Sequence, residues 1–201
     1  VSFKTHRIPP STLDAVAALR SRGIKVYIAT GRPVPFIDNL GELEYDGMIT
    51  VTGAHCFTSG GEVIYHQSVS AESVGRVVGH LTHGADAYPV IFVCSDEMFI
   101  TELNEDVDAV ARLLDIKMPP VRPASYARGK DVLQLISFFK ADREPHFMSA
   151  LMPDCTSMRW HPFFTDVIAG KALLTVFYQF IFLCIIIKCL CQGIFKTGQM
   201  R

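Results

Sequence analysis

Apolar residues recur at helical spacing between Leu13 and Leu19, which predicts an amphipathic helix near the start of the chain. Ser11 can cap the start of this helix, and Gly23 can end it. The mostly apolar run 24–29 follows directly. Because this run shows no polar alternation, it predicts a short strand in a sheet that is covered on both faces.

The same order of elements then repeats along the chain. Pro33 suits the first turn of a second helix that extends to Leu40, and residues 48–51 predict a second strand after the turn at Asp46-Gly47. Helix, strand, helix and strand at this spacing are typical of a parallel α/β sheet.

Short strands and amphipathic helices replace this order after Gly53, beginning with a hairpin around Ser59-Gly60-Gly61. Strands are expected at 54–58, 62–66, 90–94, 98–101, 132–138, 156–161 and 164–168, and helices at 70–81, 106–114 and, with Asp142 as its cap, 142–151.

These elements predict an α/β fold built on an incomplete Rossmann-like core with an inserted α+β cap domain. The expected division is a partial core at 1–53, the cap at 54–164, a return to the core at 165–171 and an apolar tail at 172–201.

The tail differs in kind from the rest of the chain, because residues 172–187 are almost entirely apolar. A membrane-spanning helix needs about 20 such residues, so the stretch 172–195 could associate with a membrane. A buried or aggregating strand fits the β-branched and aromatic residues equally well. A change of reading frame or a truncation would also explain the abrupt shift in composition.

Charge and cysteine usage exclude several classes of function. The net charge is −1 and the Lys and Arg residues are scattered, so a nucleic-acid partner is not expected. None of the six cysteines forms a CxxC pair, and no HxH or HExxH spacing occurs, so no metal ligands are assigned. Cys56 and Cys94 lie in apolar runs, which indicates a reducing, cytoplasmic setting; membrane association through the tail is the alternative.

The most informative local feature is Thr30-Gly31-Arg32, which follows the strand at 24–29. Ligands of open α/β sheets bind at the carboxyl ends of parallel strands. A hydroxyl group and backbone N–H groups at such a point can cradle a phosphate, Gly31 allows close approach of the backbone, and Arg32 can add a charged hydrogen bond. The alternative is that Thr30 only ends the strand and caps the next helix.

The run IKVYIATGRP at 24–33 resembles the second motif of haloacid-dehalogenase-type (HAD) hydrolases. The run YDGMITVTGAH at 45–55 resembles the strand that leads to an Asn-Gly-Ala turn in the Cof-type phosphatases of this superfamily, with Thr52 where Asn is usual. The resemblance covers residues 1–170. It implies a phosphate site at Thr30, Gly31, Arg32 and Lys171, and a substrate loop at Thr52, Gly53 and Ala54. Lys171 is alternatively a lysine that merely precedes the apolar tail.

The resemblance also implies residues that this chain does not contain. The family's nucleophile is the first Asp of a DxDGT turn, and its Mg²⁺ ligands include a GDGxND-like motif; neither string occurs among the 201 residues. Asp14, Asp38 and Asp46 are interpreted as helix-cap or turn residues, so no catalytic residue is assigned. Mg²⁺ is expected for a complete family member and is not expected to bind this chain.

The resulting expectation is a Cof-like HAD hydrolase that acts on small phosphorylated metabolites but is catalytically incomplete as this chain. The alternatives are a non-catalytic phosphate-binding or interaction module with a membrane-seeking tail, and a partly folded remnant without function.

Overall fold

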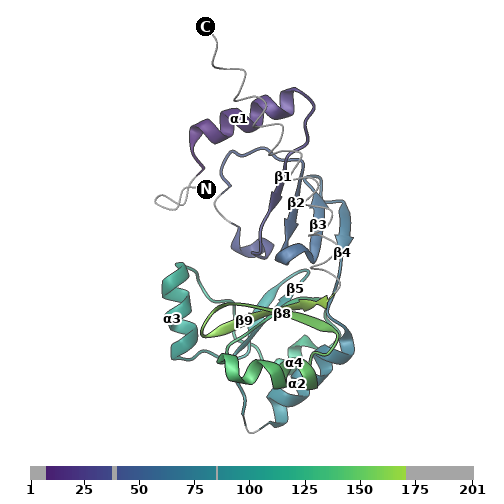
Figure 1. Ribbon diagram of the computed structural model, residues 1–201, viewed down its shortest axis with the longest axis vertical. Coiled ribbons are helices and arrows are strands. Elements are labelled where there is room, and N and C mark those ends of the chain that lie inside the picture. The colour runs from purple at the N-terminus through teal and green to yellow at the C-terminus, as the bar shows by residue number, and fades with distance from the viewer. Residues whose placement is uncertain (1–7, 38–39, 85, 171–201) are drawn as a thin grey trace.

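The computed structural model describes residues 8–37, 40–84 and 86–170, whose strands form two sheets (Figure 1). The first sheet has the order β1-β2-β3-β4, with bounds β1 (Tyr27–Ala29), β2 (Gly47–Thr50), β3 (His55–Thr58) and β4 (Val63–His66). β1 and β2 are parallel, as the sequence predicted, and the other two pairs are antiparallel. The first sheet therefore begins as a parallel α/β unit and continues as a hairpin.

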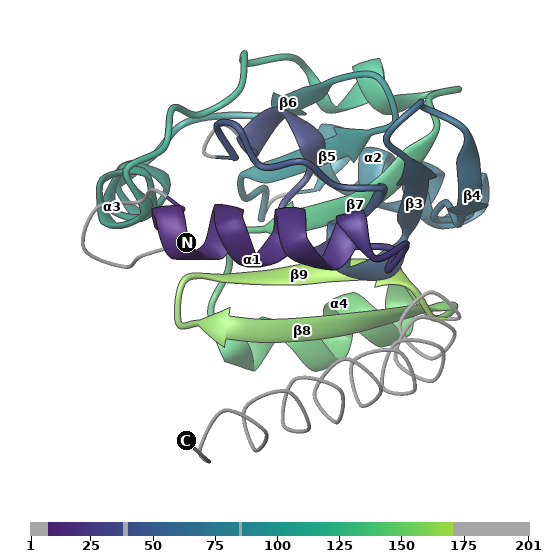
Figure 2. The same cartoon turned by 90° about the horizontal axis from the view of Figure 1, so that it is seen from above.

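The helix α1 (Pro10–Ser21) precedes β1 and runs across the near end of the molecule when it is seen from above (Figure 2). Ser11 does not cap it, because the helix already begins at Pro10 and the N-cap is Pro9. Gly23 ends the helix as predicted: its φ of 76° lets its N–H bond the Arg20 carbonyl oxygen at 2.9 Å.

Two expectations for this region are wrong. The predicted helix from Pro33 to Leu40 is only a 3-10 turn, η1 (Val34–Phe36), within the described residues. A second proline, Pro35, disfavours a regular helix because it restricts the backbone of the residue before it, and Ile37, with φ −106° and ψ 88°, leaves the helical region directly after the turn. β1 is also not covered on both faces, because its residues are half-buried or exposed in the described structure.

The second sheet is entirely antiparallel and has the order β6-β5-β7-β9-β8. Its strands are β5 (Val90–Cys94), β6 (Met98–Ile100), β7 (Val132–Ser137), β8 (Cys155–His161) and β9 (Phe164–Ala169). Its helices are α2 (Ala71–His83), α3 (Glu105–Leu114) and α4 (Glu144–Ala150), and the 3-10 turns are η3 (Ala124–Ala127) and η4 (Ala141–Arg143). Asp142 lies within η4 and does not cap α4, contrary to the prediction.

The two faces of the second sheet are packed differently. α2 and α4 lie on the face that points away from the first sheet (Figure 1), where Val77, Val78 and Phe147 join a core with Phe92 and Leu135. The opposite face, together with α3, packs against residues that follow β2 in a second core. This second core is what joins the two sheets.

The sheets do not divide at the predicted domain boundaries. β3 and β4 lie within the predicted cap at 54–164 but pair with β2 in the first sheet. All of β9 after Phe164 lies within the predicted return to the core at 165–171, but β9 pairs with β7 and β8 in the second sheet. The crossing from one sheet to the other therefore occurs after His66.

Hydrogen bonds hold in place the segment after β4 that connects the first sheet to the second. His66 Nε2 lies 2.7 Å from Asp131 Oδ2, and Ser68 Oγ contacts both side chains. The Val69 N–H group donates to the Val132 carbonyl oxygen at 2.8 Å, which ties the end of the crossing to β7.

Several predictions fall outside the described residues, namely Asp38, Lys171 and the whole tail at 172–201. In the ranges that the structure describes, no helix is long and apolar enough to cross a membrane. Cys56 and Cys94 are buried free thiols, which confirms that they behave as small apolar residues.

Candidate functional site

Thr30 lies directly after β1, at the end where the parallel strands β1 and β2 both terminate. Its backbone N–H group donates to the Ile49 carbonyl oxygen at 2.9 Å, so the hydrogen-bond pattern of the parallel pair continues through Thr30. This is the rim of the sheet where open α/β folds bind ligands.

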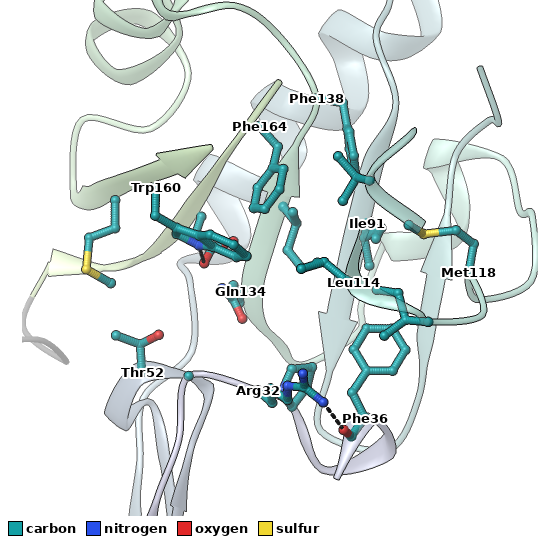
Figure 3. Close-up of a pocket in the computed structure, with 17 residues that line it drawn as sticks. Arg32, Phe36, Thr52, Ile91, Leu114, Met118, Gln134, Phe138, Trp160 and Phe164 are labelled. Carbon is teal, nitrogen blue, oxygen red and sulfur yellow. Dashed lines mark hydrogen bonds between the residues drawn. The ribbon is translucent and has the colours of Figure 1, made fainter. Parts of the chain in front are cut away.

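The loop that follows Thr30 is held by its own hydrogen bonds. The Arg32 N–H group donates to Thr30 Oγ1 at 3.1 Å. Because that oxygen acts as the acceptor, the Thr30 hydroxyl proton stays available to a ligand oxygen. Arg32 Nη1 donates to the Phe36 carbonyl oxygen at 3.4 Å, which turns the guanidinium towards η1 (Figure 3).

A second loop meets this one at the end of β2, the 3-10 turn η2 (Val51–Gly53). Val51, Thr52 and Gly53 all have positive φ values, of 52°, 53° and 94°. For β-branched residues this backbone region is strained. A Cβ atom on Gly31 would lie 3.4 Å from Thr52 Oγ1, which is an ordinary contact distance, so the two loops lie close together at the rim.

The structure thus brings together part of the predicted site. Gly31, Arg32 and Thr52 line one pocket, whereas Thr30 precedes Gly31 in the chain and is not among the lining residues. Gly53 and Ala54 are buried and do not line it; the Ala54 N–H group donates to the Val51 carbonyl oxygen at 3.0 Å and closes the turn. Lys171 lies outside the described residues.

Asp46, predicted to be a cap or turn residue, lies just before β2, at the end of the sheet opposite to Thr30. Its carboxylate accepts the Val26 N–H group at 2.9 Å, Lys25 Nζ at 3.1 Å and Arg20 Nε at 3.3 Å. The hydrogen bond from Val26, helped by both cations, lowers the pKa of Asp46 to about 2. Asp46 is therefore a structural residue that joins α1, β1 and β2.

The pocket has a volume of about 400 Å³ and lies between this rim and the second sheet (Figure 3). Most of its wall is apolar and comes from the second sheet, α3 and the segment after α3. The lining residues are Gly31, Arg32, Pro33, Phe36, Thr52, Ile91, Val110, Leu114, Ile116, Met118, Gln134, Ile136, Phe138, Met158, Trp160, Phe164 and Asp166.

Two polar residues in this wall, Gln134 on β7 and Asp166 on β9, are not among the site residues predicted from the sequence. Trp160 Nε1 donates to Asp166 Oδ2 at 2.9 Å. Burial raises the pKa of the Asp166 carboxyl to about 6, although the bond from Trp160 acts in the opposite direction. The signal that could have revealed them is a polar residue inside a strand that is otherwise apolar, as in 132–136 and 164–169.

The chemistry that the site can perform follows from its groups. A hydroxyl, backbone N–H groups and a guanidinium at a sheet rim can hold an anion. No cluster of three or more His, Cys, Asp or Glu side chains that could hold a metal ion occurs among the described residues. The rim therefore offers groups that can bind an anion, and the apolar wall of the second sheet lies across the pocket from them.

A sheet that begins with a parallel strand pair and is covered at their carboxyl ends by an antiparallel sheet with helices is the arrangement expected from the HAD resemblance. The chain belongs to the haloacid dehalogenase-like hydrolases, since the profile of that family matches residues 2–172. The resemblance inferred from the two motifs, including its Cof-type form, is thereby confirmed, and so is the α/β fold class.

Individual relatives agree with this family. YkrA of Bacillus subtilis (strain 168), a protein named as a phosphatase, is 29% identical over 164 residues, which cover 80% of this chain and 61% of YkrA. The HAD subclass IIB sugar phosphatase BT4131 is 36% identical, with a TM-score of 0.71, over 86% of this chain and 66% of that structure. BT1666 from Bacteroides thetaiotaomicron is 27% identical, with a TM-score of 0.72, over 89% and 69%.

The chain therefore spans 61% of the length of YkrA and 66% and 69% of the two solved structures. Phosphatases of the HAD family act on small phosphorylated substrates and generally use Mg²⁺.

Proposed function

We propose that this chain is the phosphate-holding and substrate-covering portion of a Cof-type phosphatase that acts on small phosphorylated metabolites. The observation that supports this most strongly is the meeting of the Thr30 loop and the Thr52 loop at one sheet rim, where both open into a covered pocket. The kinship with a sugar phosphatase is consistent with a phosphate ester as the ligand.

The position of each group at the rim determines its proposed role in binding the ligand. The Thr30 hydroxyl proton and the guanidinium of Arg32 bind the phosphate oxygens, and Gly31 leaves the backbone close enough to contribute N–H groups. Thr52 contacts the same ligand from the neighbouring loop. The apolar wall excludes water from the bound ester, which strengthens these polar contacts.

We further propose that the 201 residues bind phosphate without hydrolysing it. Phosphoryl transfer through an aspartyl-phosphate needs a carboxylate in line with phosphorus and a metal to neutralise the developing charge. A threonine and an arginine can hold the phosphate but cannot attack it. Removal of a nucleophile costs many orders of magnitude in rate.

Binding of inorganic phosphate, measured by isothermal titration calorimetry, tests the site. Thr30→Val keeps the shape of the side chain and removes the hydroxyl, and Arg32→Ala removes the charge; both are expected to weaken binding, by about fivefold or more for a charge-assisted bond. The matched controls Thr12→Val on α1 and Arg128→Ala after η3 change exposed residues of the same types far from the rim. Equal effects of Thr30→Val and Thr12→Val would contradict the proposed phosphate site.

Hydrolysis of p-nitrophenyl phosphate in the presence of Mg²⁺ tests the second part. The chain is expected to show no Mg²⁺-dependent rate above background. A rate that disappears in Thr30→Val would support the phosphate site but refute catalytic incompleteness.

A further inference from the structure

A second cavity lies beside α2, the helix that covers the face of the second sheet pointing away from the first sheet (Figure 1). This α2 cavity has a volume of about 260 Å³ and shares no lining residue with the pocket at the rim. One water molecule takes up about 30 Å³ in the liquid, so the cavity can hold a molecule of several heavy atoms. Its lining residues are Leu81, Thr82, Ala87, Tyr88, Thr101, Glu102, Pro123, Ala124 and Ser125.

Glu102 is the only charged side chain among these lining residues. It follows β6, is exposed, and has no cationic partner in the part of the chain that the structure describes. Two nearby cations have contacts of their own: Arg122 Cζ lies 5.9 Å from the centre of the Tyr126 ring, and Arg143 Nη2 lies 3.8 Å from Asp86 Oδ1. The charge that lines the cavity is therefore negative.

The end of α2 adds hydrogen-bond acceptors to the same cavity. Leu81 and Thr82 belong to the last turn of this helix. The final carbonyl groups of a helix lack partners within it and carry the negative end of its dipole. Thr82 Oγ1 donates its proton to the Val78 carbonyl oxygen at 2.7 Å, so the lone pairs of Thr82 Oγ1 remain able to accept a hydrogen bond.

The floor of the cavity is apolar and buried. Tyr88 and Ala124 are each 8% exposed and belong to the core that α2 forms with the second sheet. A carbon chain that lies on this floor is removed from water, which favours binding. The cavity thus combines an apolar floor with acceptors and a carboxylate.

We propose that the α2 cavity binds a small organic ammonium ion, with Glu102 as its counter-ion. An ammonium group carries three N–H donors and no acceptor, which matches a carboxylate and a helix end. A metal ion fits less well, because no cluster of three His, Cys, Asp or Glu side chains occurs in the described ranges. The proposal does not depend on the phosphate site at Thr30 and Arg32.

The test uses n-butylammonium as the probe and compares it with n-butanol and butyrate, which have the same carbon chain but no charge or a negative charge. Each is titrated into the isotope-labelled full chain at about pH 7.5 and constant ionic strength, and the backbone amide signals are followed by NMR. Butylammonium is expected to cause saturable shifts at Thr82, Glu102 and Ser125. Butanol should bind about fivefold more weakly or worse, and butyrate should cause no saturable shift.

Glu102→Gln keeps the size of the side chain and removes its charge, so butylammonium is expected to bind about fivefold more weakly or worse while butanol binding stays unchanged. Glu105→Gln is the matched control, because Glu105 is an exposed glutamate at the start of α3 that does not line the cavity. Thr82→Val removes the proposed acceptor and should weaken butylammonium binding about threefold. Unchanged amide signals outside the cavity establish that each variant keeps the fold.

Several outcomes would overturn the proposal. These are the lack of any saturable shift at the cavity amides, equal affinities for butanol and butylammonium, and equal losses in Glu102→Gln and Glu105→Gln. Shifts that gather at Gly31 and Arg32 would place the cation in the pocket at the rim and would also refute it. None of these results bears on the phosphate site, which Thr30→Val tests separately.

Discussion

Replacement of Asp166 by Asn is expected to stabilise the folded chain above about pH 6 and to leave it unchanged near about pH 4. Burial raises the pKa of Asp166 from 3.8 to about 6. Between these two values the folded state retains a proton that the unfolded state releases. The stability of the parent chain therefore falls as the pH rises through this window.

The size of the effect follows from the same shift. At about 1.4 kcal/mol for each pKa unit, a rise from 3.8 to about 6 destabilises the fold by about 3 kcal/mol once the carboxyl is fully ionised. Asparagine carries no charge and can still accept the hydrogen bond from Trp160 Nε1. The expected gain in the free energy of unfolding is thus up to about 3 kcal/mol at about pH 8.

Urea-induced unfolding at about pH 4 and about pH 8, followed by circular dichroism, measures the difference. Asp142→Asn, which changes an exposed aspartate of η4, serves as the control and is expected to alter stability by less than about 0.5 kcal/mol at either pH. Trp160 is the single tryptophan of the chain, so its fluorescence should report the Asp166 titration with a midpoint near pH 6. An identical stability change at both pH values, or a flat fluorescence profile in that range, would refute the reasoning.

Three further predictions concern the first sheet and its junction. Asp46→Asn should lower the free energy of unfolding at neutral pH. The loss relative to the parent chain should shrink as the pH falls from about 4 towards 2, because Asp46 has a lowered pKa and stabilises the fold only when ionised. Urea unfolding of both chains across this pH range measures the sign. Thr52→Asn should raise the free energy of unfolding by about 1 kcal/mol, since asparagine tolerates a φ of 53° better than a β-branched residue; a lower stability would contradict the strain. A double-mutant cycle on His66→Ala and Asp131→Ala should give a coupling free energy of up to about 1 kcal/mol in urea unfolding, and a value near zero would show that this pair does not fasten the junction.

Local sequence patterns were enough to locate most elements of the second sheet. The apolar run at β5 and the polar turn before β6 define a hairpin whose observed bounds differ from the prediction by at most a residue. The helix predicted after Pro33 failed because a second proline at position 35 outweighed the helix-start signal of the first.

The partners of the strands could not be predicted in the same way. The hairpin of β3 and β4 has the same local pattern whether it extends the first sheet or belongs to the second, and only its pairing with β2 decides between them. The position of Gln134 and Asp166 in the pocket could not be predicted for the same reason. The sequence shows a polar residue within each strand, but the register of β7 against β9 determines that both side chains face one pocket.

Two unfavourable local features face that pocket from opposite sides. One is the strained φ of Thr52 at the rim of the first sheet, and the other is the buried carboxyl of Asp166 on β9 of the second sheet. Neither helps the fold, and each could be relieved by a single substitution. Residues that destabilise a protein in this way persist where function requires them. A purely structural role for Asp166 predicts that Asp166→Asn is more stable at neutral pH and binds p-nitrophenyl phosphate as well as the parent chain does. A role in ligand binding predicts a variant that is more stable and binds that ester more weakly, so stability and affinity measured on one purified variant separate the two explanations.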